Sequence, residues 1–326
     1  NSGARTMAGG ARTSAPSLAL AALLCLLLAA GPIAAQSLYK YRGPDGEWIY
    51  ADRPPDDDTP VEVQALEGGD NPEVGIDVTY EFRGRTVELI ASNPSYVPIE
   101  LTLEFRTLRG VEFPDPDDDL RWVVPPRSDT LLMALDLLEN ATRPVLEFQY
   151  RYLAGDPNAR HRPDQPYRAP FAVSTNHPIT QAFPQVATHT TRDSQYAVDI
   201  AMPIGTDVMA ARAGVVFDVA ASNFSGGLDP ARDGPNANVV RILHDDGTYA
   251  IYAHLNTNTI RVRPGDRVER GQYIADSGNT GFSSGPHLHF SVVRNAGMTI
   301  ESVPVVFEGS NAEIIVPAAG AELTAY

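Results

Sequence analysis

The sequence is almost without cysteine, and this absence limits the chemistry open to it. Cys25 is the only cysteine among 326 residues, and it lies inside an apolar run near the start of the chain. Beyond that run the chain can hold no disulfide, no thiolate ligand for a metal and no cysteine nucleophile. A metal site there must therefore be built from His, Asp or Glu side chains.

Basic residues are also scarce. The chain has 25 Lys and Arg against 41 Asp and Glu, which gives a formal net charge of −16, and no basic stripe offsets it. Because such a chain would repel a polyphosphate backbone, no nucleic-acid partner is expected. Long amphipathic helical patterns are missing from residues 175–310, where short apolar runs alternate with turns. The composition and these patterns predict an all-β protein with real cores.

The start of the chain has the pattern of an export signal. An apolar run from Leu18 to Ala30 follows Arg12 and precedes small residues up to Ala35. A basic start, a short apolar core and small residues before the cut are typical of a signal peptide, so residues 1–35 are assigned to a signal peptide and leader outside the fold. An uncleaved anchor is the alternative, but the run is short for a bilayer. We expect no membrane span in the mature chain and a location in the periplasm or cell envelope, or outside the cell.

A short hairpin module is expected at residues 36–60. Two runs of alternating aromatic residues flank Gly43-Pro44-Asp45-Gly46, a hairpin signal, and an acidic, Pro-rich linker ends at Pro60. Together with the Asp52-Arg53-Pro54-Pro55 sequence that follows the hairpin, the segment resembles a small envelope module of unknown function.

An immunoglobulin-like β-sandwich is expected at residues 75–155, because short strand-like runs alternate there with turns. One acidic run in this part could bind calcium, but it lacks the ordered spacing and the glycine of an EF-hand loop, which favours a solvated loop. Its carboxylates are Asp115, Asp117, Asp118 and Asp119.

Residues 156–310 carry almost every feature of chemical interest, and residues 311–326 form a C-terminal tail. His287 and His289 stand two apart in a strand-like run, so both rings project from one face and can share one metal ion. Asp199 lies in an apolar strand, where a carboxylate needs a partner or a metal. His254 ends another such run. Taken singly, each of these residues could instead be a solvated residue at a strand end.

Taken in order, these segments resemble the lysostaphin-type zinc metallopeptidases, which cut peptide crosslinks in bacterial cell walls. The motifs follow the family's order and roughly its spacing. The matching runs are Asp199–Thr206, Ala210–Val216, Asn238–Ile242, Tyr252–Leu255, Val262–Asp266 and Gly281–Phe290.

The resemblance implies a β-sheet catalytic domain with an open groove and one zinc ion per chain. It makes Asp199 and His289 zinc ligands, and it makes His254 and His287 the two non-ligand histidines that activate the zinc-bound water and stabilise the transition state. Zinc with three protein ligands keeps a fourth position for water, and neutral imidazoles nearby can take and return a proton. The sequence does not decide which histidine takes which role.

One position departs from the family pattern. The family places its first zinc histidine four residues before the aspartate, where this chain has Gln195. The next histidine upstream is His189, in a polar, turn-forming run that could return to the metal. We expect His189 to be the third ligand, and the competing interpretation is a solvated loop histidine.

The other polar candidates are weaker. Tyr196 and Asn238 are expected to border the substrate groove, although core packing or turn formation explains each equally well. His244 precedes a turn and is expected at the surface, and His161 and His177 are expected to be exposed rather than ligating.

The expected function is zinc-dependent hydrolysis of peptide bonds in the stem or crosslink peptides of peptidoglycan. Gln195 keeps open a catalytically inactive wall-binding or amidase-activating regulator of the same fold. A zinc peptidase acting on proteins would use the same residues. An acidic enzyme acting on the anionic wall polymer would approach it without electrostatic attraction. We therefore expect the electrostatic potential in the groove to be less negative than that of the whole chain.

Overall fold

The computed structural model describes residues 74–115, 119–139 and 144–326, together with the backbone of four strands nearer the start of the chain. These four are β1 (Gly3–Ala8), β2 (Ser37–Arg42), β3 (Trp48–Ala51) and β4 (Glu62–Ala65). The apolar core of the predicted signal peptide, at 18–30, lies outside the described residues. The described chain is mostly β, as predicted.

The four early strands make two kinds of pairing. β2 pairs antiparallel with β3, with Arg42 opposite Trp48, and β4 pairs with the other edge of β2. The two aromatic runs therefore form the antiparallel pair that the sequence predicted. β1 lies in the predicted leader and pairs antiparallel with β10, with Gly3 opposite Tyr152. The assignment of residues 1–35 to a signal peptide and leader stays a prediction. The edge of β10 offers unpaired backbone donors and acceptors, which any neighbouring extended segment can satisfy.

Two small sheets share one apolar core in the next part of the chain. The first holds β5 (Asp77–Arg83), β6 (Thr86–Asn93) and β9 (Ser128–Asp136). The second adds β7 (Ile99–Arg109), β8 (Arg121–Val124) and β10 (Val145–Ala154) to β1. Alternate residues of both sheets face this core, as Val87 and Leu89 do from one sheet and Phe148 and Tyr150 from the other.

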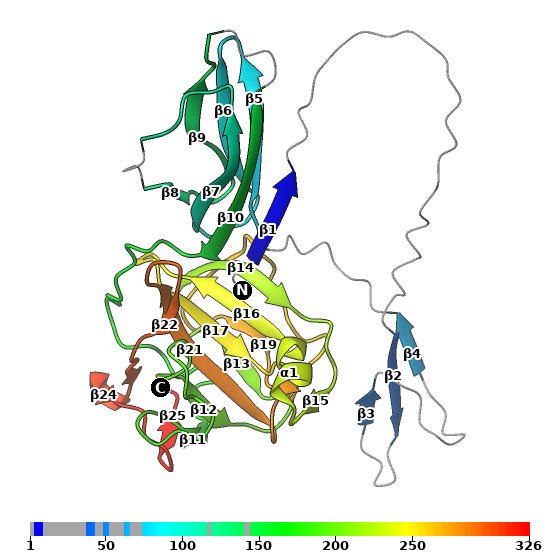
Figure 1. Ribbon diagram of the computed structural model, residues 1–326. Helices are drawn as coiled ribbons and strands as arrows, with labels where there is room; N and C mark the ends of the chain where they lie inside the picture. The colour runs from blue at the N-terminus through cyan, green and yellow to red at the C-terminus, as the bar shows by residue number, and fades with distance from the viewer. Residues whose placement is uncertain are drawn as a thin grey trace.

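The rest of the chain is built on one nine-stranded sheet (Figure 1). Its centre is β21 (His287–Asn295), which lies between β17 (Tyr249–Ala253) and β12 (Val198–Ala201). The other strands are β11 (Asn176–Gln181), β14 (Gly214–Ala220), β16 (Val239–Leu243), β18 (Arg267–Val268), β22 (Ile300–Ser302) and β25 (Glu322–Thr324).

Shorter pairs and helical turns complete this part. The pairs are β13 (Asp207–Met209) with β19 (Tyr273–Asp276), β15 (Gly226–Gly227) with β20 (Gly281–Phe282), and β23 (Phe307–Glu308) with β24 (Ile314–Ile315). The helical segments are α1 (Pro230–Asp233) and two 3₁₀ turns, Gly234–Asn236 and Ser310–Ala312. In the part of the chain that the structure describes, no helix is long and apolar enough to cross a membrane.

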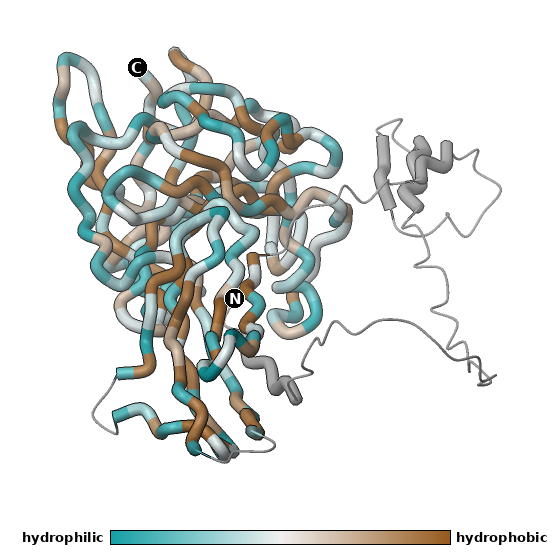
Figure 2. The backbone as a smooth tube through the Cα atoms, turned by 90° about the horizontal axis from the view of Figure 1, so that it is seen from above, coloured by the Kyte–Doolittle hydropathy of each residue, from teal (hydrophilic) through white to brown (hydrophobic). Residues whose placement is uncertain are grey.

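The two faces of the central sheet have different roles. Leu288, Phe290 and Val292 point into the core and are fully buried, while His287 and His289 alternate with them on the other face. This is the arrangement that the period of two predicts. Apolar stretches run along the strands and polar residues gather in the connecting loops (Figure 2). Each large core side chain contributes about 1.5–3 kcal/mol by its burial.

The small sheets pack against the far end of the face that carries the histidines. Tyr249, Val293 and Phe217 of the central-sheet part share a core with them. Glu100 of β7 is fully buried at this junction and accepts hydrogen bonds from Asn295 Nδ2 at 2.7 Å and from the Met298 amide at 2.7 Å. One end of the polar face is therefore covered, and the other end is left open.

Candidate active site

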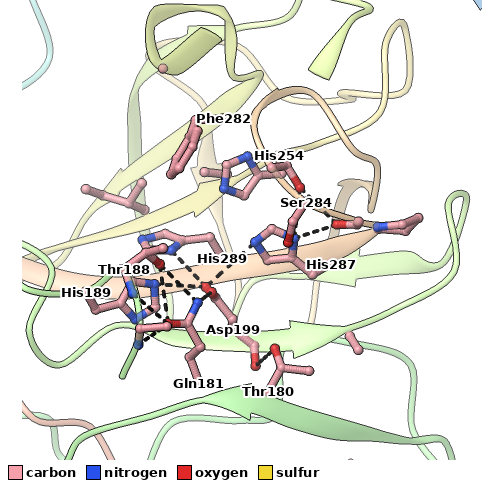
Figure 3. A pocket seen from close by; sticks show the side chains of 18 of the residues that line it. Thr180, Gln181, Thr188, His189, Asp199, His254, Phe282, Ser284, His287 and His289 are labelled. Atoms are coloured by element: carbon pink, nitrogen blue, oxygen red, sulfur yellow. Dashed lines mark hydrogen bonds and ion pairs between the residues drawn. The ribbon is translucent and has the colours of Figure 1, made fainter. Parts of the chain in front are cut away.

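The open end of the polar face forms a groove of about 680 Å³. Its floor is made by alternate residues of the central strands, among them Arg241, Ile251, Ala253 and His289. Loops on either side form the walls, and Figure 3 shows His254, His287 and Asp199 converging there. The sequence predicted such an open groove.

Two histidines meet the carboxylate of Asp199 at the β12 end of the groove. Asp199 and His289 are opposite one another in the ladder of β12 and β21. Asp199 Oδ1 lies 3.0 Å from His289 Nδ1 and 3.2 Å from His189 Nε2. His189 and Asp199 are each only 4% exposed. The fold thus brings together three side chains, those of His189, Asp199 and His289, that lie up to a hundred residues apart in the sequence.

This cluster fits a zinc ion. Tetrahedral zinc with bonds of about 2.0–2.1 Å sets neighbouring ligand atoms about 3.3 Å apart, close to the two distances above. The ligand atoms of His189, Asp199 and His289 all lie within 4.8 Å of one another.

His189, and not Gln195, belongs to the cluster. The ring of His189 lies 4.9 Å from that of His289. Gln195 is half-buried in the turn before β12 and is not among the residues that line the groove. Because His189 is buried, its interpretation as a solvated loop residue is wrong.

His254 and His287 form a second pair beside the cluster, with ring centroids 4.5 Å apart. His254 Nδ1 lies 2.7 Å from the carbonyl oxygen of Thr280, and His287 Nδ1 lies 2.8 Å from that of Gly285. Since a carbonyl only accepts, each Nδ1 carries a proton, and the Nε2 of each ring is left to exchange a proton. His287 Nε2 lies 3.8 Å from Asp199 Oδ1, so this pair borders the metal-binding residues.

The surroundings shift the pKa values of Asp199 and His254 below their ordinary values. Burial, followed by repulsion from His287 and His289, lowers the pKa of His254 to about 3. Burial alone would raise the pKa of Asp199, but hydrogen bonds from His189 and His289 hold that pKa well below its usual range. At neutral pH the site therefore combines a carboxylate with a neutral imidazole.

Few charged side chains line the groove. Among the described residues that line it, Asp199 is the one carboxylate and Arg241 the one guanidinium, in a chain of net charge −16. Arg241 in turn forms an ion pair with Asp218, which does not line the groove. The lower negative potential expected in the groove stays a prediction.

The structure places the two predicted substrate contacts elsewhere. Asn238 is fully buried, and its Nδ2 donates to the carbonyl oxygens of Asn223 at 2.6 Å and Leu255 at 3.2 Å. The ring of Tyr196 packs 5.0 Å from that of Phe183. Neither residue lines the groove. Asn238 instead fixes the turn that follows His254.

Other sequence assignments change as well. His244 is 3% exposed, not at the surface as expected, because its Nδ1 lies 2.9 Å from the carbonyl oxygen of Ala213 and the ring of Tyr167 packs against it. His161 and His177 are half-buried and lie away from the groove. Gln181, which hydrogen-bonds to Asp199, was not singled out by the sequence, because it belongs to no motif.

Comparisons with known proteins agree with this geometry. Residues 193–301 match the model of Peptidase family M23, and residues 23–73 match a domain of unknown function, DUF4124. Both resemblances seen in the sequence are confirmed. The first match begins four residues after His189, so this histidine comes from just outside the matched segment.

The related proteins are longer than the part they share with this chain. Glycyl-glycine endopeptidase ALE-1 of Staphylococcus capitis is 36% identical over 104 residues, 32% of this chain and 25% of the relative. Peptidoglycan DD-endopeptidase ShyA of Vibrio cholerae serotype O1 is 34% identical over 151 residues, 44% of this chain and 30% of the relative. The chain thus spans less than a third of either relative. A structure of lysostaphin from Staphylococcus simulans is 31% identical, covering 39% of this chain and 47% of that one, with a TM-score of 0.29.

Proposed function

Since residues 193–301 form a domain of Peptidase family M23, we propose that the chain is a zinc-dependent metalloendopeptidase that hydrolyses peptide bonds in the stem or crosslink peptides of peptidoglycan. One observation carries the proposal: His189, Asp199 and His289 converge beside the paired imidazoles of His254 and His287 in a single groove. The names of the relatives, a glycyl-glycine endopeptidase and a peptidoglycan DD-endopeptidase, support the substrate class.

We assign metal binding to three residues of the groove and proton transfer and oxyanion binding to two others. His189, Asp199 and His289 would hold one zinc ion, which polarises a carbonyl and lowers the pKa of water when bound. His254 and His287 each have Nε2 available for proton exchange, because each Nδ1 is committed to a backbone carbonyl. One imidazole, unprotonated at Nε2, accepts the proton of the attacking water and returns it to the leaving amine. The other, protonated at Nε2, donates a hydrogen bond to the developing oxyanion.

The competing functions are less well supported. An inactive regulator was suggested by Gln195, but the buried His189 supplies the missing third side chain. A peptidase acting on proteins would use the same groove, so only the substrate separates it from the proposal. Digestion of isolated peptidoglycan, with analysis of the products, distinguishes the two.

We further propose an envelope location, by export through residues 1–35, because a cell-wall peptide is reached only there. The two small sheets with their common core support an immunoglobulin-like β-sandwich at residues 75–155.

Zinc stoichiometry tests the proposed function directly. We expect one zinc per chain in the purified protein, lost in His189→Ala and kept in Gln195→Ala. A folded parent protein that binds no zinc and leaves peptidoglycan intact would exclude the peptidase.

A further inference from the structure

Gln181 stands where two parts of the metal-binding cluster meet. It is the last residue of β11, lies opposite Asp199 in the antiparallel ladder and lines the groove. Its side chain reaches both the Asp199 carboxylate and the loop that carries His189 (Figure 3). We infer that Gln181 is a positioning residue that holds these two metal-binding side chains in register. This inference rests on the proposed function.

The first contact fixes the carboxylate. Gln181 Nε2 donates to Asp199 Oδ2 at 2.6 Å, while Oδ1 of the same carboxylate faces His189 and His289. The terminal torsion of an aspartate is broad and roughly two-fold, so an untethered carboxylate can exchange its two oxygens. The amide of Gln181 removes that freedom, and Oδ1 stays directed at the histidines.

The second contact fixes the loop. Gln181 Oε1 accepts hydrogen bonds from the backbone amides of Ala187 at 2.7 Å and Thr188 at 3.0 Å. Ala187 and Thr188 are exposed, whereas His189 directly after them is buried. Ordering an exposed backbone residue costs conformational entropy. Gln181 offsets part of this cost and brings the backbone before His189 to the site without help from a metal.

Only a side chain that donates and accepts can make both contacts. The carboxylate of Asp199 accepts and the two backbone amides donate, so the carboxamide has one satisfactory orientation. A glutamate at this position would place a second carboxylate against Asp199. A methionine would match the length and make neither hydrogen bond. The requirement is therefore for glutamine itself, not for a polar residue of similar size.

Zinc affinity measured against a chromophoric chelator tests the inference. Groups that hydrogen-bond to metal ligands change metal affinity by about 10–100-fold when they are mutated. We expect a loss of that size in both Gln181→Glu and Gln181→Met. Gln185→Glu is the matched control, because Gln185 is an exposed glutamine four residues further along the same loop, and its zinc affinity should equal that of the parent protein.

Thermal unfolding of the zinc-free proteins separates positioning from folding. We expect the melting temperatures of the parent and both Gln181 variants to agree closely, since Gln181 orders one exposed loop at the groove edge and that loop can open locally while the core stays folded. Unchanged zinc affinity in both variants would overturn the inference while leaving the peptidase proposal intact. A fall in affinity matched by an equal fall in zinc-free stability would also overturn it, because Gln181 would then serve folding alone. A parent protein without zinc would instead contradict the proposed function.

Discussion

The imidazoles of His254 and His287 lie 4.5 Å apart, with each Nδ1 bound to a backbone carbonyl. This arrangement fixes a proton on the Nδ1 of both rings through the backbone, and no carboxylate of the described residues is a hydrogen-bond partner of either Nδ1. Both accepting carbonyls come from the glycine-rich segment that leads into β21. The conformation of that segment therefore determines whether each ring has its Nε2 available for proton exchange.

Substituting either histidine should separate chemistry from metal binding. In His254→Ala and in His287→Ala we expect kcat to fall by about 10²–10⁴-fold, the usual contribution of a positioned acid or base. One zinc per chain should remain, because the ligand set of His189, Asp199 and His289 is untouched. Turnover of a crosslinked muropeptide and zinc content are measured on the same samples. His161→Ala, which is remote from the groove, should keep full activity, and equal activity in all three variants would refute the assignment.

The support behind His254 can be tested at Asn238. This buried side chain donates to the carbonyl oxygen of Leu255, the residue after His254. Asn238→Asp keeps the shape and removes both donated hydrogen bonds, so we expect a loss of about 1–3 kcal/mol in the free energy of unfolding for each buried group left unpaired. Peptidase activity should fall with it, as the turn after His254 loosens. Asn258→Asp, at an exposed position of the same connection, is the control in denaturant titrations.

The sequence predicted those parts of the site that follow from the alternation of side chains along a strand. His287 and His289 project together because a strand alternates, and Leu288 is buried for the same reason. His189 could be predicted only from a family pattern and the lack of any nearer histidine, since a loop's return path is set by tertiary contacts. Gln181 had no signal, because a glutamine at the end of a strand is chemically ordinary until Asp199 is placed opposite it.

One error has a plain physical cause. His244 is a polar residue beside a turn, for which exposure is the usual expectation. In the fold, the ring of Tyr167, a residue distant in sequence, packs against it. Such contacts cannot be obtained from local composition, so the burial of His244 was missed, whereas core packing was one of the explanations left open for Asn238.

The junction between the small sheets and the central sheet should depend on Glu100. Its buried carboxylate accepts hydrogen bonds from Asn295, Met298 and Arg121. Because hydrogen bonds to a charged group contribute about 1.5–3 kcal/mol, we expect Glu100→Ala to lower the free energy of unfolding by about 3 kcal/mol. Glu104→Ala, on the exposed side of the same strand, should change it little. Urea titration followed by tyrosine and tryptophan fluorescence measures both, and equal midpoints would show that the junction contributes nothing.

Acid should destabilise the protein partly through His244. Burial lowers the pKa of this imidazole to about 4 from an ordinary value of 6.5, so it is neutral in the fold across that interval and protonated in the unfolded chain. The unfolded state then binds more protons, and stability falls as the pH falls from 6.5 towards 4. The shift corresponds to about 3 kcal/mol, all of it present above pH 6.5.

His244→Gln isolates this contribution from the other histidines. The variant is less stable at neutral pH, but its free energy of unfolding should decrease less steeply than that of the parent between pH 6.5 and 4. Urea titrations at closely spaced pH values, with a chelator present so that loss of zinc does not add to the slope, give the comparison. Because the other buried imidazoles are identical in the two proteins, the difference in slope belongs to His244. Parallel curves would mean that this residue titrates alike in the folded and unfolded chains, and its burial would then have no consequence for acid stability.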